Sequence, residues 1–530
     1  MSDVYTAISF APVQGFIERS RKLRDLYGAS QILSYLSNKV VCHAHAMGVT
    51  VISPALDFNH SNMDIVQGMP NRILMSGKFS GNDARSALAE GWNEITSACK
   101  TWIEEQLRND FTFSNEGWGR AWAKWKANSW EVFWGEGPTI SEAMLALETN
   151  KLRRDWIVPN WNGESSSLSG SDAIVYPNID SHVGIKYNPG QEREEIRQFY
   201  QKLAATLENT RQQDEPKFLD PTEWLSIPEL VKRLVTHHQV SKRIDEQQSF
   251  YASSFREMLR IKDKDRICGE EGYWTGWFMG DGDKVGKHLQ GLANAEAIAA
   301  FSRSLRIWGK KFQSDFELGR VVYAGGDDFF GVMYGTEKKP QREGAEAISF
   351  LIDLGEKWKD GKLGINLSVS FVWAGHSVPQ RDILQHCREA EKRAKNLGRD
   401  RVTIRILFNN GQSIEWTTPW KYLEWLKDYR DRNGQTGKDA NWSHVYSDLA
   451  QLKARHAIAP RTKRKIPKIS DDAVALSLFG LYFGKDELGQ DKKDELSRDR
   501  KKITGSEDTE SVIQWIEGMI QVGWQLCSDS

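Results

Sequence analysis

The sequence predicts an α+β protein of several domains, in which two sheet-containing halves flank a mainly helical segment. Three observations lead to this prediction. The chain has 530 residues, which exceeds the size of one ordinary domain. The element order expected near the N-terminus, β-α-β-β-α, returns in the second half as β-α-β-β-α-β. The residues between and after these halves carry helical patterns.

The first half is expected over residues 1–114. Residues 4–12, VYTAISFAP, are rich in β-branched and aromatic side chains and predict a strand. Apolar residues then recur at helical spacing from 16 to 36, and Gly28 is the expected break between two helices. The remaining expected elements of this half are two strands and a helix: 49–56, 71–79 and 81–107.

Residues 115–265 are expected to form a mainly helical middle domain. The segments GWGRAWAKWKANSWEVFWG, QEREEIRQFYQKLAATLENT and SIPELVKRLVTHHQVSKR all lie in it and indicate helices. Residues 413–530, with TPWKYLEWLKDYR and DTESVIQWIEGMIQVGWQLC, predict a C-terminal helical domain. The 21 tryptophans of the chain are interpreted mainly as packing residues of cores and interfaces.

The second half is expected over residues 266–412 and contains an unusual hairpin. Residues 321–333 read VVYAGGDDFFGVM, which predicts two apolar strands joined at Gly325 and Gly326. An earlier strand, YWTGWFM, runs directly into the acidic sequence GDGD. Helices are expected on both sides of the hairpin, and the last one reads PQRDILQHCREAEKRAKNLG.

Composition and charge favour a soluble globular protein and argue against a membrane-spanning or disulfide-rich one. Charged residues make up 27% and hydrophobic residues 39% of the chain, as in soluble globular proteins, and no apolar stretch approaches the roughly 20 residues that span a bilayer. The net charge is −1, so nucleic acid contacts would have to come from local patches. Five separated cysteines without a C-x-x-C pair argue against a disulfide framework and a zinc ribbon. A cytoplasmic location is therefore expected, without a signal peptide.

Four aspartates are the candidate metal ligands. Asp327 and Asp328 project at the hairpin turn, while Asp281 and Asp283 follow the earlier strand. Clustered carboxylates repel one another unless a cation lies between them, and two Mg²⁺ or Mn²⁺ ions would supply it. Two such ions stabilise the attacking and leaving oxygens of a phosphoryl displacement. Ordinary turn chemistry is the alternative interpretation of the Gly-Asp sequence on its own.

Phosphate contacts are expected next to these aspartates. The segment that begins near Lys284 would offer backbone N–H groups to a triphosphate if it opens a helix. The helix AEKRAKNLG carries basic residues, including Lys395, that are candidate phosphate ligands; a solvated helix face is the alternative.

The combination of these motifs resembles palm-type nucleotide cyclases and polymerases, and more closely the large subunit of type III CRISPR effector complexes of the Cmr (type III-B) kind. The segment FIERSRKLRDLYGAS, residues 16–30, is similar to the opening palm segment of that family, and LSIPELVKRL, residues 225–234, is similar to part of its middle domain. The resemblance implies two ferredoxin-like palm domains, a helical middle domain and a helical C-terminal domain.

The resemblance also implies residue roles and a reaction. Members of this family bind two ATP molecules between their palms and, when target RNA is bound, join them into cyclic oligoadenylate. The implied catalytic residues are Asp281, Asp327 and Asp328, with Asp283 as a weaker metal ligand. The remaining implied residues contact nucleotide: Gly28, Ser30, Lys284, Gly325, Gly326 and Lys395.

The same resemblance implies partners and two absences. The partners are a small helical subunit, the subunit that binds the crRNA 5′ end, guide crRNA and target RNA. Since the first palm strand begins near residue 4, the HD nuclease domain found in many relatives is expected to be absent, and no zinc site is expected. A basic run of seven residues within 453–468 is a candidate RNA or partner contact, with a solvated loop as the alternative; it includes Lys453, Arg455, Arg461, Lys463, Arg464 and Lys465.

Two other functions remain open from the sequence. The first is a structural subunit of the same kind of ribonucleoprotein that no longer turns over nucleotide. The second is a free-standing diguanylate-type cyclase, which the paired palm halves and the long helical extensions disfavour. The intact aspartates favour the enzyme.

Overall fold

The structure is a computed structural model, and two compact units make up the chain. The first unit holds Met1–Arg256, Leu289–Lys311 and Val322–Gly326, and the second holds the remainder. The residues that the structure describes are 4–56, 68–153, 163–179, 188–212, 217–245, 250, 272–292, 294–336, 339–455, 457–458, 472–484, 487–506 and 509–528.

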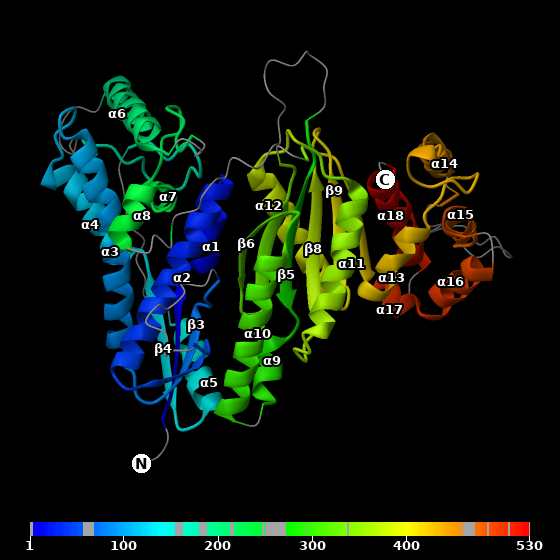
Figure 1. The fold of residues 1–530 in the computed structure, drawn as a ribbon, viewed down its shortest axis with the longest axis horizontal. Coiled ribbons are helices and arrows are strands. Elements are labelled where there is room, and N and C mark those ends of the chain that lie inside the picture. The colour runs from blue at the N-terminus through cyan, green and yellow to red at the C-terminus, as the bar shows by residue number, and fades with distance from the viewer. Residues whose placement is uncertain are drawn as a thin grey trace. The chain divides into compact units, whose positions relative to one another are not determined.

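A four-stranded antiparallel sheet forms the centre of the first unit (Figure 1). Its strand order is β2-β3-β1-β4, which is the order of a ferredoxin-like β-α-β-β-α-β domain. The predicted strands of this half are confirmed. The bounds of the four strands are β1 (Tyr5–Ala11), β2 (Thr50–Ser53), β3 (Arg72–Ser76) and β4 (Glu131–Gly137).

The strand β4 lies inside the segment that was expected to be mainly helical. It pairs with β1 along its whole length, from Tyr5 opposite Gly137 to Ala11 opposite Glu131. Without it, the backbone groups on that edge of β1 would have no partner. The sequence EVFWGEG also fits a strand, because Phe133 and Gly135 are buried and alternate with more exposed residues. The domain limit at residue 114 stays a prediction, and this sheet extends past it.

Helices cover both faces of the first sheet. Ile8 and Phe10 of β1 share a core with α2 (Leu23–Ala46) and α3 (Gly81–Leu107). Ala7 points to the opposite face and packs with Ala143 and Leu147 of α5 (Ile140–Lys151). This alternation along one strand is what a sheet covered on both faces requires.

The expected break at Gly28 is wrong. The helix α2 runs through that glycine without interruption, and the break falls earlier, between α1 (Val13–Glu18) and the start of α2 at Leu23. Gly28 is buried by a helix of the middle segment, so tertiary packing holds the backbone helical there. Further described helices that lie wholly in the first unit are η1 (Asn115–Gly119), α4 (Arg120–Asn128), α6 (Pro189–Thr210), α7 (Ile227–Leu234) and α8 (His238–Ile244).

The second sheet has six strands in the order β10-β9-β8-β5-β7-β6 (Figure 1). Its part β8-β5-β7-β6 repeats the strand order of the first sheet, so the prediction of two ferredoxin-like palm domains is confirmed. The bounds are β5 (Thr275–Gly282), β6 (Gly319–Gly325), β7 (Asp328–Met333), β8 (Leu367–Ala374), β9 (Arg401–Leu407) and β10 (Ser413–Pro419).

The predicted hairpin corresponds to β6 and β7, but β10 was assigned to the C-terminal helical domain. It is instead an edge strand that pairs with β9, from Ser413 opposite Leu407 to Pro419 opposite Arg401. Its proline closes the strand, at a sheet edge where a missing N–H is tolerated. The sheet therefore continues past residue 412, which was the expected limit of this domain.

Two sets of helices enclose the second sheet. The ring of Phe278 on β5 contacts Phe312 of α10 (Ala295–Asp315) and Phe350 of α11 (Gly344–Asp360). The Sγ of Cys387 on α12 (Gln380–Asn396) lies 3.8 Å from the carbonyl oxygen of Trp277. The remaining helix of this domain is α9 (Val285–Gln290), directly after β5.

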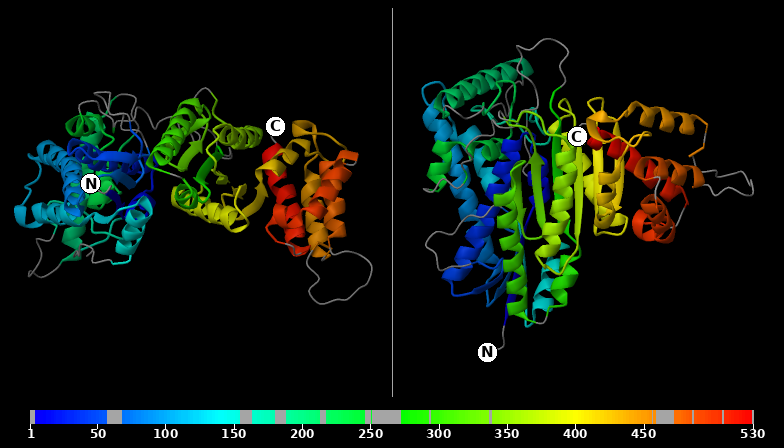
Figure 2. Two further views of the ribbon diagram at one scale, coloured as in Figure 1. Left: turned by 90° about the horizontal axis from the view of Figure 1, so that it is seen from below. Right: turned by 45° about the vertical axis from the view of Figure 1, so that its right-hand side comes forward.

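The C-terminal helices gather at the β10 edge of this sheet (Figure 2). The rings of Trp416 on β10 and Trp515 on α18 lie 5.4 Å apart, so tryptophan packing joins the two elements as the composition suggested. Among the described helices none is long and apolar enough to cross a membrane. The helices of this domain are α13 (Trp420–Leu423), η2 (Glu424–Asp428), η3 (Gly437–Asp439), α14 (Ser443–Ala454), α15 (Ala473–Phe483), α16 (Glu487–Arg498), α17 (Arg500–Thr504) and α18 (Thr509–Cys527).

Candidate active site

The antiparallel pairing of β5 and β7 places two of the predicted aspartates opposite each other. Asp281 near the end of β5 is the register partner of Asp328 at the start of β7. Directly opposite residues of an antiparallel pair lie on the same face of the sheet, and like charges in that position destabilise it. The backbone N–H of Gly282 donates to the carbonyl oxygen of Asp327 at 2.8 Å, which brings the third aspartate to the same corner.

The hairpin turn depends on glycine at one position. Gly326 has φ +66°, in the left-handed region that residues with a Cβ rarely adopt. The chain can therefore reverse between β6 and β7 and present Asp327 and Asp328 at the tip. This is the local reason that the GGDD sequence delivers two carboxylates to the end of the neighbouring strand β5.

The electrostatics of this corner are unfavourable for three charged carboxylates. The Asp328 side chain reaches solvent, yet the protein packed around its carboxyl group and the nearby Asp327 and Asp281 raise its pKa well above the ordinary value. A positive group should stabilise such a cluster.

One such group is Lys395 of α12. Its Nζ lies 2.7 Å from Oδ2 of Asp281 and 2.5 Å from Oε1 of Glu391, which precedes it by one helical turn. Burial alone would lower the pKa of Lys395, but its hydrogen bonds to Asp281 and Glu391 raise it. The predicted lysine thus lies at the predicted aspartates. Glu391 was not predicted, although its i,i+4 spacing from Lys395 was a signal for such a pair.

Asp283 has a different environment from Asp281. Its carboxylate accepts hydrogen bonds from the Ser368 hydroxyl at 2.7 Å and from the Asp400 backbone N–H at 2.9 Å. Arg399 and Asp400 both have positive φ, at 65° and 52°, so their turn is strained. Asp283 stabilises this turn by accepting the hydrogen bond from Asp400. Metal ligation by Asp283 stays a prediction, and the geometry gives this carboxylate a structural role.

The donor set of the corner fits a hard divalent cation. It consists of carboxylate oxygens, and an ammonium group already occupies a cation position between two of them. In the described part of the chain, however, no three His, Cys, Asp or Glu side chains converge as a ready ligand set. Asp281 and Asp328 are therefore the residues that would hold a cation, after rearrangement of the lysine.

Lys284, also predicted to contact phosphate, follows β5 directly and is exposed. It has φ +58° and immediately precedes α9, which has only six residues. The condition for that contact, a helix that begins here, is met. Its contact with phosphate stays a prediction.

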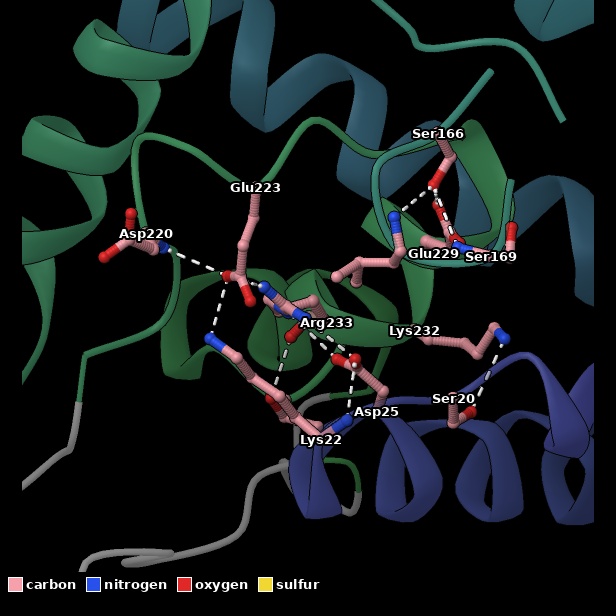
Figure 3. Close-up of polar contacts among 12 residues, drawn as sticks. Ser20, Lys22, Asp25, Ser166, Ser169, Asp220, Glu223, Glu229, Lys232 and Arg233 are labelled. Carbon is pink, nitrogen blue, oxygen red and sulfur yellow. Dashed lines mark hydrogen bonds and ion pairs between the residues drawn. The ribbon is translucent and has the colours of Figure 1, made fainter. Parts of the chain in front are cut away.

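The segment that resembles the family in the first half forms an interhelical contact. Asp25 of α2 accepts hydrogen bonds from Nε and Nη2 of Arg233 on α7, at 2.9 and 2.8 Å, and Figure 3 shows the surrounding charges. Nη1 of Arg233 donates to Glu223 at 2.6 Å, and Lys22 reaches the same carboxylate at 2.8 Å. The two resembling segments, 16–30 and 225–234, thus pack against each other.

The charges at the centre of this α2–α7 cluster alternate in sign, because Arg233 pairs with both Asp25 and Glu223, and Lys22 pairs with Glu223. Burial alone would raise the pKa of Asp25, but the Arg233 guanidinium, with a smaller contribution from Lys232, holds it below its ordinary value. Burial also lowers the pKa of Lys232 to about 8, and its Nζ donates to the Phe16 carbonyl at 2.8 Å. Glu229 closes the other end of the cluster by accepting hydrogen bonds from Ser166 and Ser169 (Figure 3).

Two residues expected to contact nucleotide lie inside this interface region. A Cβ on Gly28 would lie 1.9 Å from the backbone oxygen of Lys232, so this glycine allows α7 to approach α2 closely. Ser30 is also buried, at 5% exposure. Packing explains the glycine, and nucleotide contact by either residue stays a prediction.

Of the basic patch within residues 453–468, the structure describes only the first residues. Lys453, in the last turn of α14, forms an ion pair with Glu517, and Arg455 at the end of that helix is exposed. Their contact with RNA or a partner stays a prediction. The other candidate residues of this patch lie outside the described residues: Arg461, Lys463, Arg464 and Lys465.

Comparison with known families identifies the two sheet domains. Residues 274–403 match the second palm domain of Cas10/Cmr2, and residues 5–110 match the N-terminal domain of the CRISPR-associated protein Cmr2. Both sheet domains are thus similar to parts of the large subunit of type III CRISPR effector complexes. These matches agree with the sequence resemblance to that family.

Solved structures match this chain at low identity, and a Cmr-beta complex shares its fold. A type III-B Cmr-beta complex in the apo state contains a chain that is 11% identical, with TM-score 0.54, over 87% of this chain and 76% of that one. The Csm1–Csm4 cassette in complex with one ATP matches at 15% identity and TM-score 0.48, over 99% of this chain and 70% of that one. The same cassette with pppApApA matches at 15% identity and TM-score 0.49, over 99% and 69%. No curated protein matches the sequence significantly.

Proposed function

We propose that the second palm domain joins ATP molecules into cyclic oligoadenylate when its effector complex has bound target RNA. The observation that carries this proposal is the register pairing of Asp281 with Asp328 at the corner that Lys395 also reaches. Because like charges opposite each other destabilise a sheet, we infer that these aspartates serve a function other than folding stability. The Cas10/Cmr2 assignment of residues 274–403 supports the choice of nucleotide chemistry.

The proposed reaction is a nucleotidyl transfer. The 3′ oxygen of one ATP forms a bond to the α-phosphorus of another, the bond from that phosphorus to the bridging oxygen breaks, and pyrophosphate leaves. The 3′ hydroxyl proton passes to solvent. Bound Mg²⁺ or Mn²⁺ would supply Lewis-acid stabilisation of the attacking and leaving oxygens.

Residues of this chain hold the reactants in this proposal. Asp281 and Asp328 hold the divalent cations, with Asp327 beside them. Lys395 contributes positive charge for a triphosphate. Gly326 leaves its side of the turn open, since no atom lies within 4 Å of the position of a Cβ, whereas Gly325 is packed against the backbone of Gly68. The proposed partners are the small helical subunit, the crRNA 5′-end-binding subunit, guide crRNA and target RNA.

The test uses the assembled complex with cognate target RNA, ATP and Mn²⁺, and separates nucleotide products by chromatography. Asp281→Asn and Asp328→Asn are each expected to lower the rate of product formation by roughly 100-fold or more, since each removes a ligand of the cation that would stabilise charge at the reacting phosphate. The matched control is Asp353→Asn on α11, an exposed residue of the same domain that should leave the rate unchanged.

Two outcomes would contradict the proposal. Product formation that persists in both variants would place the chemistry elsewhere in the complex. No product from the wild-type complex, with target RNA verified as bound, would favour the structural-subunit alternative.

A further inference from the structure

Lys395 and its partners form a small ion cluster with a specific arrangement. The ammonium group lies between Oδ2 of Asp281 on β5 and Oε1 of Glu391 on its own helix. The side chains of Asp281 and Lys395 are about one-third exposed, at 30% and 29%, and that of Glu391 is 17% exposed. The lysine therefore has one anchor within α12 and one on the strand that carries a proposed cation ligand.

We propose that Lys395 is the resting counter-ion of the acidic corner and competes with a divalent cation for Asp281. This inference rests on the proposed function, because it concerns the cation that Asp281 and Asp328 would hold. In the resting arrangement the Lys395 ammonium group faces Asp281, and Asp327 and Asp328 lie next to Asp281. A divalent cation can bind the Asp281 carboxylate only after the Lys395 ammonium group has moved away from it.

Glu391 gives the lysine a place to remain after that release. It lies one helical turn before Lys395, so the i,i+4 ion pair does not depend on β5. The released ammonium group is then held at the edge of the site, where it is available to an anionic ligand such as a nucleoside triphosphate. Glu391 is thus a positioning residue, which acts through Lys395.

The competition also accounts for the ligand geometry of the corner. Within the described residues no set of three carboxylate, histidine or cysteine ligands is ready for a cation. A lysine that holds Asp281 keeps the site closed to ions in the absence of substrate. Access of the cation is then coupled to the movement of one side chain.

The test measures Mn²⁺ binding to the purified full-length chain by the loss of the electron paramagnetic resonance signal of free Mn²⁺, without nucleotide. Lys395→Met removes the competing charge and is expected to tighten Mn²⁺ binding by about three- to fivefold, the size expected for loss of one partly exposed ion pair. Lys395→Arg retains the charge and should bind Mn²⁺ as the wild type does. The matched control is Lys392→Met, an exposed lysine on the same helix, which should have no effect.

Asp281→Asn separates this inference from the proposed function. It is expected to weaken Mn²⁺ binding by about tenfold or more, because one ligand is lost. If Asp281→Asn weakens binding and Lys395→Met leaves it unchanged or weaker, the competition is overturned and the cation site stands. If Asp281→Asn binds Mn²⁺ as the wild type does, or no protein binds it, the proposed cation site itself fails.

Discussion

The two palm domains share one strand order but differ at the same corner of the sheet. At the end of the β1–β3 pair the last partners are Ser9 and Arg72, and Arg72 forms an ion pair with Glu148 of α5. At the equivalent end of the β5–β7 pair the last partners are Asp281 and Asp328. The same topology thus carries a compensated charge in the first domain and two like charges in the second.

The first unit places its buried charges elsewhere, between α2 and α7. There Asp25, Arg233 and Glu223 alternate in sign, and Arg233 is completely buried. The comparison distinguishes two uses of a buried or crowded carboxylate. Asp25, a carboxylate with a lowered pKa and a guanidinium partner, stabilises the fold. Asp328, a carboxylate with a raised pKa among other carboxylates, indicates a site that binds a ligand.

The largest expected effect on stability comes from a substitution that disrupts the α2–α7 charge cluster. Arg233→Met leaves Asp25 and Glu223 without their guanidinium partner and is expected to destabilise the first unit by about 3–5 kcal/mol. The melting temperature of that unit should fall by on the order of 10 °C, measured by scanning calorimetry. Arg197→Met is the control, since Arg197 forms an exposed ion pair with Glu194 and its loss should be nearly neutral. Equal melting temperatures for the two variants would mean that the α2–α7 charges do not stabilise the fold.

A smaller effect is expected at the close approach of the same two helices. Gly28→Ala places a methyl group against the backbone of Lys232, which cannot move as a side chain would, and should destabilise by roughly 1–3 kcal/mol. Thermal unfolding measures this loss. Gly286→Ala on α9 is the matched control, because no atom lies within 4 Å of the added Cβ. A Gly28→Ala variant as stable as the wild type, but with weakened ATP binding, would instead favour the nucleotide contact expected from the sequence.

Local sequence patterns predicted the central strands and the hairpin, and they placed Asp281 at the same corner as Asp327 and Asp328. The DGD and GGDD motifs could be placed together because a strand end and a hairpin tip meet when their strands pair. The edge strands β4 and β10 are not predicted, since each lies next to a helical pattern. The partner of β4 is the distant strand β1, whereas β10 pairs with the strand directly before it, β9.

The roles of individual residues were harder to predict than the strands. Gly28 and Asp25 belong to a sequence motif whose reason appears only when α7, about 200 residues away, packs against it. Glu391 could not be predicted as a site residue, because its role depends on the contact between Lys395 and Asp281. Long-range partners, which one sequence does not reveal, decide these roles.

The central measurement makes the same chemical change in both clusters, and its Asp328 variant has the smallest expected effect. Asp25→Asn and Asp328→Asn each remove one carboxylate charge, and their melting temperatures are compared with wild type at neutral pH in chelator. A carboxyl with a lowered pKa stabilises the fold above its unfolded pKa, and that contribution is lost as the pH falls. A carboxyl with a raised pKa stabilises it while protonated, and that contribution is lost as the pH rises.

At neutral pH Asp25→Asn is therefore expected to lower the melting temperature by several degrees. Asp328→Asn should raise it slightly, and this gain should shrink as the pH is lowered towards 4. Opposite signs would support the distinction between a structural and a functional carboxylate. A fall in melting temperature for both variants would contradict it.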